Sequence, residues 1–385
     1  MSDHRRSSCR ALRTLIAALP LFAFAADARG QGDRVSRLIA DLSSPDREVR
    51  LQAVNMLGTI AAWESATPLI GALGDPEVDV RDAAADAVEQ IGDVTVPLLA
   101  EGLKSDAATV RAGCADVLGR FLGSSDAEEE IAFALLGVVK DPEADVRYYV
   151  AAGLGRLEKP EATEALRDLV RDPDLRVRTA AATSLAQQGD PTGVSVLLAA
   201  ARQTDPALRR AAIAGLGIVK SPQAIQALVD LTGDAEEEVR KCAYCALLMS
   251  GAANSATPGL AGLTDPEWRV RAEVARTLGF APVPEASDRL LATLQDDSSA
   301  SVRVAAAISL GFRKEKRAVE PLLAMLGKDR RDMERSGAAQ ALGLLAAQEA
   351  IKPLTDLLED EDARVRRSAR LALQMILEDC PDCPK

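Results

Sequence analysis

Apolar and small residues recur along this chain at helical spacing, within a block that returns about every 31 residues. In residues 75–92, DPEVDVRDAAADAVEQIG, the side chains of Val80, Ala84, Val88 and Ile91 fall on one face of a helix. Blocks of the same design occupy residues 141–157, 172–189 and 265–280. The pattern predicts amphipathic helices throughout the repeats, with essentially no strand.

Each block contains an arginine, usually after valine, that serves as a ruler for the repeat. These ruler arginines are Arg50, Arg81, Arg111, Arg147, Arg178, Arg209, Arg240, Arg271, Arg303, Arg335 and Arg366. They are 30 to 32 residues apart, except for one interval of 36 residues that contains extra residues near 123–130. A period sustained over residues 33–377 predicts a solenoid of about eleven repeats and not separate globular domains.

Each repeat is expected to form two helices joined by a turn. An Asp-Pro pair precedes the second helix in five repeats, as Asp75-Pro76, Asp141-Pro142, Asp172-Pro173, Asp205-Pro206 and Asp265-Pro266. Aspartate is favoured at the N-cap and proline at the first helical position, so the second helices are expected to begin at these pairs. The fold class is therefore all-α, a right-handed superhelix of about 22 helices.

Glycine often follows a leucine near the end of the second helix. The pairs are Leu154-Gly155, Leu216-Gly217, Leu278-Gly279 and Leu310-Gly311. A residue without a Cβ lets two helix backbones approach closely, so these glycines predict tight packing between neighbouring second helices.

These repeats resemble HEAT repeats, in particular the short bacterial form called the phycobilisome (PBS) lyase HEAT-like repeat. That family has an aspartate six residues before the arginine, and here the same position holds Asp75, Asp141, Asp172, Asp234, Asp265, Asp297, Asp329 and Asp360. Ser44, Ser105 and Gln203 fill the position in the other three repeats. The resemblance implies a structural ladder of Asp and Arg side chains between neighbouring repeats, which includes Arg81, Arg147, Arg178, Arg240 and Arg271. It implies a structural role for the arginines and not a row of anion-binding sites.

Residues 1–28 have the layout of a secretory signal peptide. Four arginines precede the apolar run 14–26, and the small-residue patterns Ala23-Phe24-Ala25 and Ala26-Asp27-Ala28 follow. The run is too short to span a bilayer, and no later stretch is long and apolar enough, so no membrane span is expected after cleavage. We expect cleavage between Ala25 and Gln31 and an exported protein, periplasmic or extracellular.

Charge and composition exclude several functions. The formal net charge of −12 argues against a nucleic-acid partner, because such proteins usually have a basic surface. The one histidine is His4, inside the predicted signal peptide, so the mature chain cannot build a Ser-His-Asp or Cys-His pair or a histidine-containing metal site. We expect no enzyme activity and no cofactor. The alternative is an enzyme or cofactor carrier like the bilin lyases and iron hydroxylases among HEAT-like proteins.

Two C-x-x-C patterns are candidates for redox or metal sites. Cys242 and Cys245 lie beyond the start of a predicted helix, where ordinary small helix residues are the simpler interpretation than a redox pair. Cys380 and Cys383 lie in the tail 378–385, where a local disulfide or a disordered end is expected. A joint Cys₄ zinc site is disfavoured because stacked repeats would keep the two pairs far apart.

The HEAT resemblance also implies that the second helices line a concave groove. Counted from each ruler arginine, positions −1, +3 and +7 are apolar or small, so positions +1, +5 and +9 are expected to face the groove. The +9 row reads Thr59, Gln90, Arg120, Arg156, Gln187, Ile218, Met249, Phe280, Phe312, Leu344 and Met375. Its later, apolar members either pack under the next loop or form a hydrophobic stripe that binds a partner.

The candidate binding residues combine aromatic and basic side chains within an acidic protein. They are Tyr148, Arg210, Lys241, Arg276, Phe280 and Phe312. The sequence therefore predicts a non-enzymatic scaffold that binds protein or peptide partners along the groove. A purely structural component of the cell envelope is a third possibility.

Overall fold

The computed structural model describes residues 32–123, 126–252, 254–328 and 330–378. Within these ranges all regular structure is helical and there is no strand, as predicted for an all-α repeat protein. The first element is a helix over residues 32–41. The predicted signal peptide and both tail cysteines, Cys380 and Cys383, lie outside the described residues.

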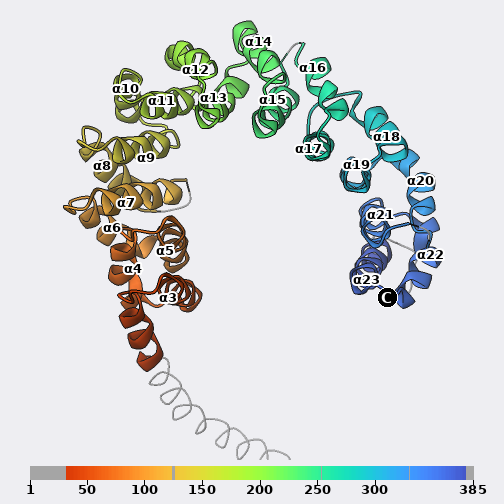
Figure 1. Ribbon diagram of the computed structural model, residues 1–385, viewed down its shortest axis with the longest axis horizontal. Coiled ribbons are helices and arrows are strands. Elements are labelled where there is room, and N and C mark those ends of the chain that lie inside the picture. Colours follow the sequence, from red (N-terminus) through yellow and green to blue (C-terminus); the bar gives the residue numbers. More distant parts are fainter. Residues whose placement is uncertain (1–31, 124–125, 253, 329, 379–385) are drawn as a thin grey trace, which may run out of the picture. The chain divides into compact units, whose positions relative to one another are not determined.

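The chain forms two compact units, Met1–Val177 and Arg178–Lys385. The second helices of the first unit are α3 (Arg47–Ile60), α5 (Val78–Ile91), α7 (Ala108–Phe121) and α9 (Ala144–Leu154), and its first helices are α4 (Ala66–Ala72), α6 (Val96–Gly102), α8 (Glu128–Gly137) and α10 (Pro160–Leu169). Each second helix of this unit packs against the next second helix and so forms one layer. The first helices form the other layer (Figure 1). The boundary between the units falls inside α11 (Leu175–Gln187).

The second unit repeats this two-layer arrangement. One layer contains the second helices α13 (Pro206–Val219), α15 (Glu237–Ser250), α17 (Trp268–Leu278), α19 (Ala300–Phe312), α21 (Asp332–Leu344) and α23 (Ala363–Glu378). The other contains α12 (Val194–Ala200), α14 (Pro222–Leu231), α16 (Ala256–Leu260), α18 (Ala286–Asp296), α20 (Val319–Ala324) and α22 (Ile351–Asp356) (Figure 1). Short 3-10 helices in the two units are Trp63–Ser65, Asp93–Thr95, Pro191–Gly193, Ala261–Thr264, Lys316–Ala318, Gln348–Ala350 and Leu357–Glu359.

The core between the two layers is built from Leu, Val and Ala. In α17 the residues at positions −1, +3 and +7 are Val270, Val274 and Leu278, and all three are fully buried. They belong to one continuous cluster with Leu290 of α18 and Leu310 of α19. The helical period of the sequence therefore identifies the buried face correctly.

Glycines near the ends of the second helices allow close contact between neighbouring helices. A Cβ placed on Gly217 of α13 would come 3.2 Å from the Cβ of Ala246 in α15. A Cβ on Gly343 of α21 would come 2.7 Å from the Cα of Ala372 in α23, which is shorter than van der Waals contact. The close approach expected at Gly217 is confirmed, and Gly343, for which no prediction was made, has a similar contact.

The predicted helix starts at the Asp-Pro pairs are wrong in most repeats. The helix α5 begins at Val78 with Glu77 as its N-cap, and α17 begins at Trp268 with Glu267 as its N-cap. Only α13 begins as predicted, with Asp205 as N-cap accepting a hydrogen bond from Ala207 N. The reason is register: Asp205 stands four residues before its ruler arginine, whereas the other aspartates stand six before and serve the turn.

Candidate functional site

Arginine–aspartate pairs tie the repeats together in both units. In each pair the arginine Nε and Nη2 atoms bind both carboxylate oxygens of the aspartate in the next repeat, with Nη1 donating to main-chain carbonyls of its own turn. The pairs are Arg50–Asp75, Arg111–Asp141, Arg147–Asp172, Arg209–Asp234, Arg240–Asp265, Arg271–Asp297 and Arg335–Asp360. The side chain of Asp265 is 1% exposed and that of Arg240 is 12% exposed, so this pair lies in a largely dry environment.

The aspartate of each pair has a second role in its own turn. Oδ1 of Asp75 accepts a hydrogen bond from Glu77 N at 3.0 Å, and Oδ1 of Asp265 accepts one from Glu267 N at 2.9 Å. At Asp360, the hydrogen bond from Arg335 lowers the pKa of the carboxyl group below its ordinary value. The carboxylate of Asp360 is therefore held charged by the fold, as expected of a structural residue.

Four arginines differ from this scheme. Arg366 belongs to the last repeat, and its Nη1 donates to the main-chain carbonyls of Asp360 and Glu361. Arg303 binds Glu334, with Nη2 2.7 Å from Oε1, while Asp329 lies outside the described residues. For Arg81, the corresponding position of the next turn holds Ser105 in place of aspartate. Arg178 lies on α11, at the boundary between the units.

The later members of the +9 row lie on the surface of the second unit. Side-chain exposure is 39% for Ile218, 52% for Met249, 65% for Phe280 and 47% for Phe312. The rings of Phe280 and Phe312 are in contact, with their centroids 4.9 Å apart. Side chains this exposed are not packed under a loop, so the geometry favours the hydrophobic stripe over the alternative.

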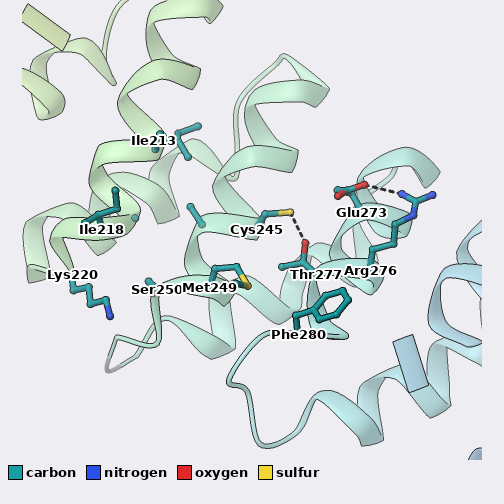
Figure 2. A pocket seen from close by; sticks show the side chains of 13 residues that line it. Ile213, Ile218, Lys220, Cys245, Met249, Ser250, Glu273, Arg276, Thr277 and Phe280 are labelled. Carbon is teal, nitrogen blue, oxygen red and sulfur yellow. Dashed lines mark hydrogen bonds and ion pairs between the residues drawn. The ribbon is translucent and has the colours of Figure 1, made fainter. Parts of the chain in front are cut away.

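A groove of about 950 Å³ lies between the exposed ends of α13, α15 and α17. Figure 2 shows the side chains that line it, with Ile218, Met249 and Phe280 contributed by three successive second helices. Small residues, Ala214, Gly217 and Ala246, also line it. Positions +5 and +9 of these helices thus form one apolar hollow, which we call the α13–α17 groove.

The charged groups beside this groove are predominantly basic. Arg276 forms an exposed ion pair with Glu273 at 2.8 Å, and Lys241 pairs with Glu238. Lys220 lines the groove at its other end (Figure 2), and Arg210 is exposed on α13. Of these charged residues, Lys220, Arg276 and Glu273 line the groove, so two cations and one carboxylate border it in a chain whose net charge is −12.

The structure brings only some of the predicted binding residues together. Arg276 and Phe280 line the groove, and Phe312 extends it through its contact with Phe280. Tyr148 belongs to the other unit, on α9, where its ring meets Tyr149 edge to face at 5.2 Å. Sequence reasoning missed Lys220, because a residue that ends α13 in the left-handed conformation, with φ of 54°, has no place in the helical period.

The cysteine pair on α15 has none of the features of a redox site. Burial raises the pKa of the Cys245 thiol to about 11 and also raises the pKa of Cys242. Both are free thiols, and Thr277 Oγ1 donates to Cys245 Sγ at 3.1 Å. Reactive thiols need a lowered pKa, so the raised pKa values favour the interpretation as ordinary helix residues for this pair.

The described residues contain neither a metal-binding cluster nor a membrane-spanning helix. No group of three or more His, Cys, Asp or Glu side chains among them is arranged to hold a metal ion. Among the helices of residues 32–123, 126–252, 254–328 and 330–378, none has the length and apolar character needed to cross a bilayer.

The stacked pairs of helices define a repeat protein of the α-solenoid class. Models of HEAT repeats match residues 35–127, 131–207, 194–264 and 256–343, and the model of the PBS lyase HEAT-like repeat matches residues 334–360. The chain therefore belongs to the HEAT repeat family, as the sequence pattern predicted. No curated protein matches its sequence.

Several solved structures are similar in fold. A chain of the CpcE–CpcF complex of phycocyanin lyase from Nostoc sp. PCC7120 is 22% identical, with a TM-score of 0.43 over 62% of this chain and 94% of that chain. Yeast importin-beta (Kap95p) is 14% identical, with a TM-score of 0.48 over 90% of this chain and 55% of that chain. Human deoxyhypusine hydroxylase is 23% identical, with a TM-score of 0.28 over 65% of this chain and 97% of that chain.

Proposed function

We propose that this protein is an exported, non-enzymatic scaffold that binds an acidic, amphipathic helix of a partner protein on the second unit. The observation that carries the proposal is the row of exposed apolar side chains at one position of four successive second helices, Ile218, Met249, Phe280 and Phe312. Apolar side chains gathered in this way, rimmed by polar groups, are typical of a binding surface. The HEAT fold itself leaves the function open.

Charge favours an acidic partner. Lys220 and Arg276 line the α13–α17 groove together with Glu273, and Arg210 and Lys241 occupy position +1 of two of the same helices. Glu238 and Glu273 pair with only two of these four cations. A carboxylate-bearing partner gains attraction there, whereas a basic partner meets repulsion. The net charge of the whole chain, −12, would instead favour a basic partner, so the local surface makes a distinct prediction.

Spacing favours a helical partner over an extended one. Closely packed helices lie about 8–10 Å apart, so each repeat advances the +9 side chain by about that distance. Seven residues of an α-helix advance about 10.5 Å and return to the same face, which matches one heptad to each repeat. An extended peptide returns to the same face about every 7 Å, out of step with the row. The expected mode is therefore a helix laid across the second helices.

A binding titration tests this proposal directly. The probe is a synthetic amphipathic helix of about 21 residues, about 32 Å long, with leucines on one face at heptad positions and glutamates beside them. Fluorescence anisotropy measures its affinity for the purified protein, for Met249→Gln, and for Gln90→Ala at the same +9 position of the first unit. We expect Met249→Gln to weaken binding by about tenfold, because a buried apolar anchor contributes roughly 1–2 kcal/mol, and Gln90→Ala to leave it unchanged.

The comparison peptides decide between possible occupants. A peptide of the same apolar pattern with lysines in place of glutamates, and an acidic peptide with scrambled apolar positions, should both bind more weakly. Equal binding of all three peptides would contradict the proposal. Preference for a fatty acid, or self-association that Met249→Gln abolishes, would assign the surface to a lipid or to a second copy instead.

Export is the second part of the proposal. It is supported by the order of basic, apolar and small residues in 1–28. Mass spectrometry of protein recovered from the periplasm or medium should find a first residue between Ala26 and Gln31. An intact Met1 on the functional protein would contradict export by this route.

A further inference from the structure

One contact between repeats in the first unit lacks its carboxylate. At the junctions that follow Arg50, Arg111 and Arg147, the next turn supplies Asp75, Asp141 and Asp172. At the junction that follows Arg81, the same position of the next turn holds Ser105. The other junctions therefore show the site with its carboxylate in place, and the junction at Arg81 lacks that carboxylate.

The guanidinium of Arg81 has the same main-chain contacts as the arginines that bind an aspartate. Its Nη1 donates to the carbonyl oxygens of Asp75 at 2.7 Å and Pro76 at 2.9 Å. Nη1 of Arg111 makes the equivalent bonds to Ser105 at 2.8 Å and Asp106 at 3.1 Å while binding its carboxylate with Nε and Nη2. Because the guanidinium is planar, fixing Nη1 in this way directs the Nε and Nη2 edge of Arg81 toward the next turn.

Ser105 completes its own turn but does not reach the arginine. Its Oγ accepts a hydrogen bond from Ala107 N at 3.2 Å, as Asp141 Oδ1 accepts one from Glu143 N at 2.9 Å. Serine is shorter than aspartate and uncharged, so it replaces the turn-forming oxygen without supplying two acceptors. Among the described residues, Arg81 forms no ion pair with a carboxylate.

We propose that Arg81 and Ser105 form a binding site for a small oxyanion. The ligand is one that presents two coplanar acceptor oxygens, a carboxylate or a phosphate, to Nε and Nη2 of Arg81 in the manner of Asp141 on Arg111. The site is half-buried at the turn, so the anion displaces water and not a protein group. It lies in the first unit and is independent of the proposed partner helix.

This site qualifies the interpretation of the ruler arginines from sequence. In the paired junctions, Nε and Nη2 of the arginine bind an aspartate of the protein, so the arginine has a structural role alone. At Arg81 the same geometry is available to a ligand because one residue of the repeat differs.

Thermal unfolding in phosphate tests the inference. The purified protein is melted with increasing sodium phosphate at constant ionic strength set by sodium chloride. We expect phosphate to raise the melting temperature of the wild type by about 2 °C at concentrations well above its dissociation constant, since a ligand that binds only the folded state stabilises it. Sodium acetate should act in the same direction.

Two variants fill or remove the site. Ser105→Asp supplies the missing carboxylate, so it should melt higher without phosphate and lose the phosphate response. Arg81→Met should also lose the response. Ser44→Asp is the matched control, because Ser44 Oγ accepts from Asp46 N in the same turn position but the sequence has no ruler arginine before it. It should respond to phosphate as the wild type does.

The outcomes separate a site from a general salt effect. A phosphate response of equal size in wild type, Ser105→Asp and Arg81→Met would overturn the inference, as would no response in the wild type. A stabilising effect of Ser44→Asp equal to that of Ser105→Asp would show that the added aspartate acts on the turn and not on Arg81.

Discussion

The two units use the same repeat but present different surfaces at the +9 position. In the first unit Arg120 forms ion pairs with Asp86 at 2.8 Å and Asp116 at 2.6 Å, and Arg156 donates to the carbonyl of Gly119 at 2.9 Å. In the second unit the same position holds the exposed side chains of Met249 and Phe280. These arginines of the row thus find polar partners within their own unit, while apolar members leave surface that a partner can cover.

The charges at positions +1 and +5 differ in the same way. The first unit has Asp82, Asp86 and Asp116 at these positions, where the second unit has Arg210, Lys241 and Arg276. Burial raises the pKa of Tyr149 in the first unit, and the nearby carboxylate of Asp116 raises it further. The two units therefore differ in side chains at positions +1, +5 and +9, which do not build the core. The binding surface can vary in this fold without a change in the scaffold.

The largest expected effect tests whether the Arg–Asp pairs stabilise both units to the same extent. Arg111→Ala in the first unit and Arg240→Ala in the second each leave a buried aspartate without its guanidinium. Breaking a buried ion pair from one side costs about 3 kcal/mol, so both variants should lower the free energy of unfolding by a similar amount in urea titrations.

The control for these two variants is the loss of an ion pair on the surface. Arg276→Ala removes the exposed contact with Glu273, which contributes about 0–1 kcal/mol. A large loss of stability in only one of the two buried variants would break the comparison, since the ladder would then support one unit alone.

A smaller effect tests whether the surfaces differ in function. Arg210→Glu reverses a charge at position +1 of the second unit, and Asp82→Lys reverses one at the matching position of the first. We expect Arg210→Glu to weaken binding of the acidic helical probe about tenfold at low salt and less at 0.5 M salt, because exposed charges are screened. Asp82→Lys should leave the affinity unchanged.

Equal losses in Arg210→Glu and Asp82→Lys would mean that the probe senses total charge and not the local surface. A loss that persists at high salt would point to damaged packing of α13, which circular dichroism would detect. Either result would contradict the claim that the two units differ in their binding surfaces.

Most of the architecture could be predicted from the sequence because the repeat reports it many times. The −1, +3 and +7 positions identify buried residues such as Val270 and Leu278, since helix geometry alone decides which side chains share a face. Gly217 marks close helix contact for the same local reason. Helix starts were harder, because Asp75 and Asp205 look alike in sequence and differ only in their distance from the arginine.

The candidate sites show where such reasoning ends. The +9 row contained Met249 and Phe280, but their exposure depends on what the neighbouring repeat places over them. Lys220 enters the groove through a left-handed backbone residue that no periodic pattern describes. Position in the repeat groups Tyr148 with Arg276, although the two residues belong to different units.

By itself the sequence determined the helices, the period of about 31 residues, the buried faces and the family, because each depends on contacts within a repeat or on a pattern restated in every repeat. The tertiary structure decided which side chains stay exposed, how each paired arginine binds the aspartate of the next repeat, and where three helix ends enclose an apolar groove. These features arise between neighbouring repeats, where the outcome depends on distances and directions across a junction that no single stretch of sequence specifies.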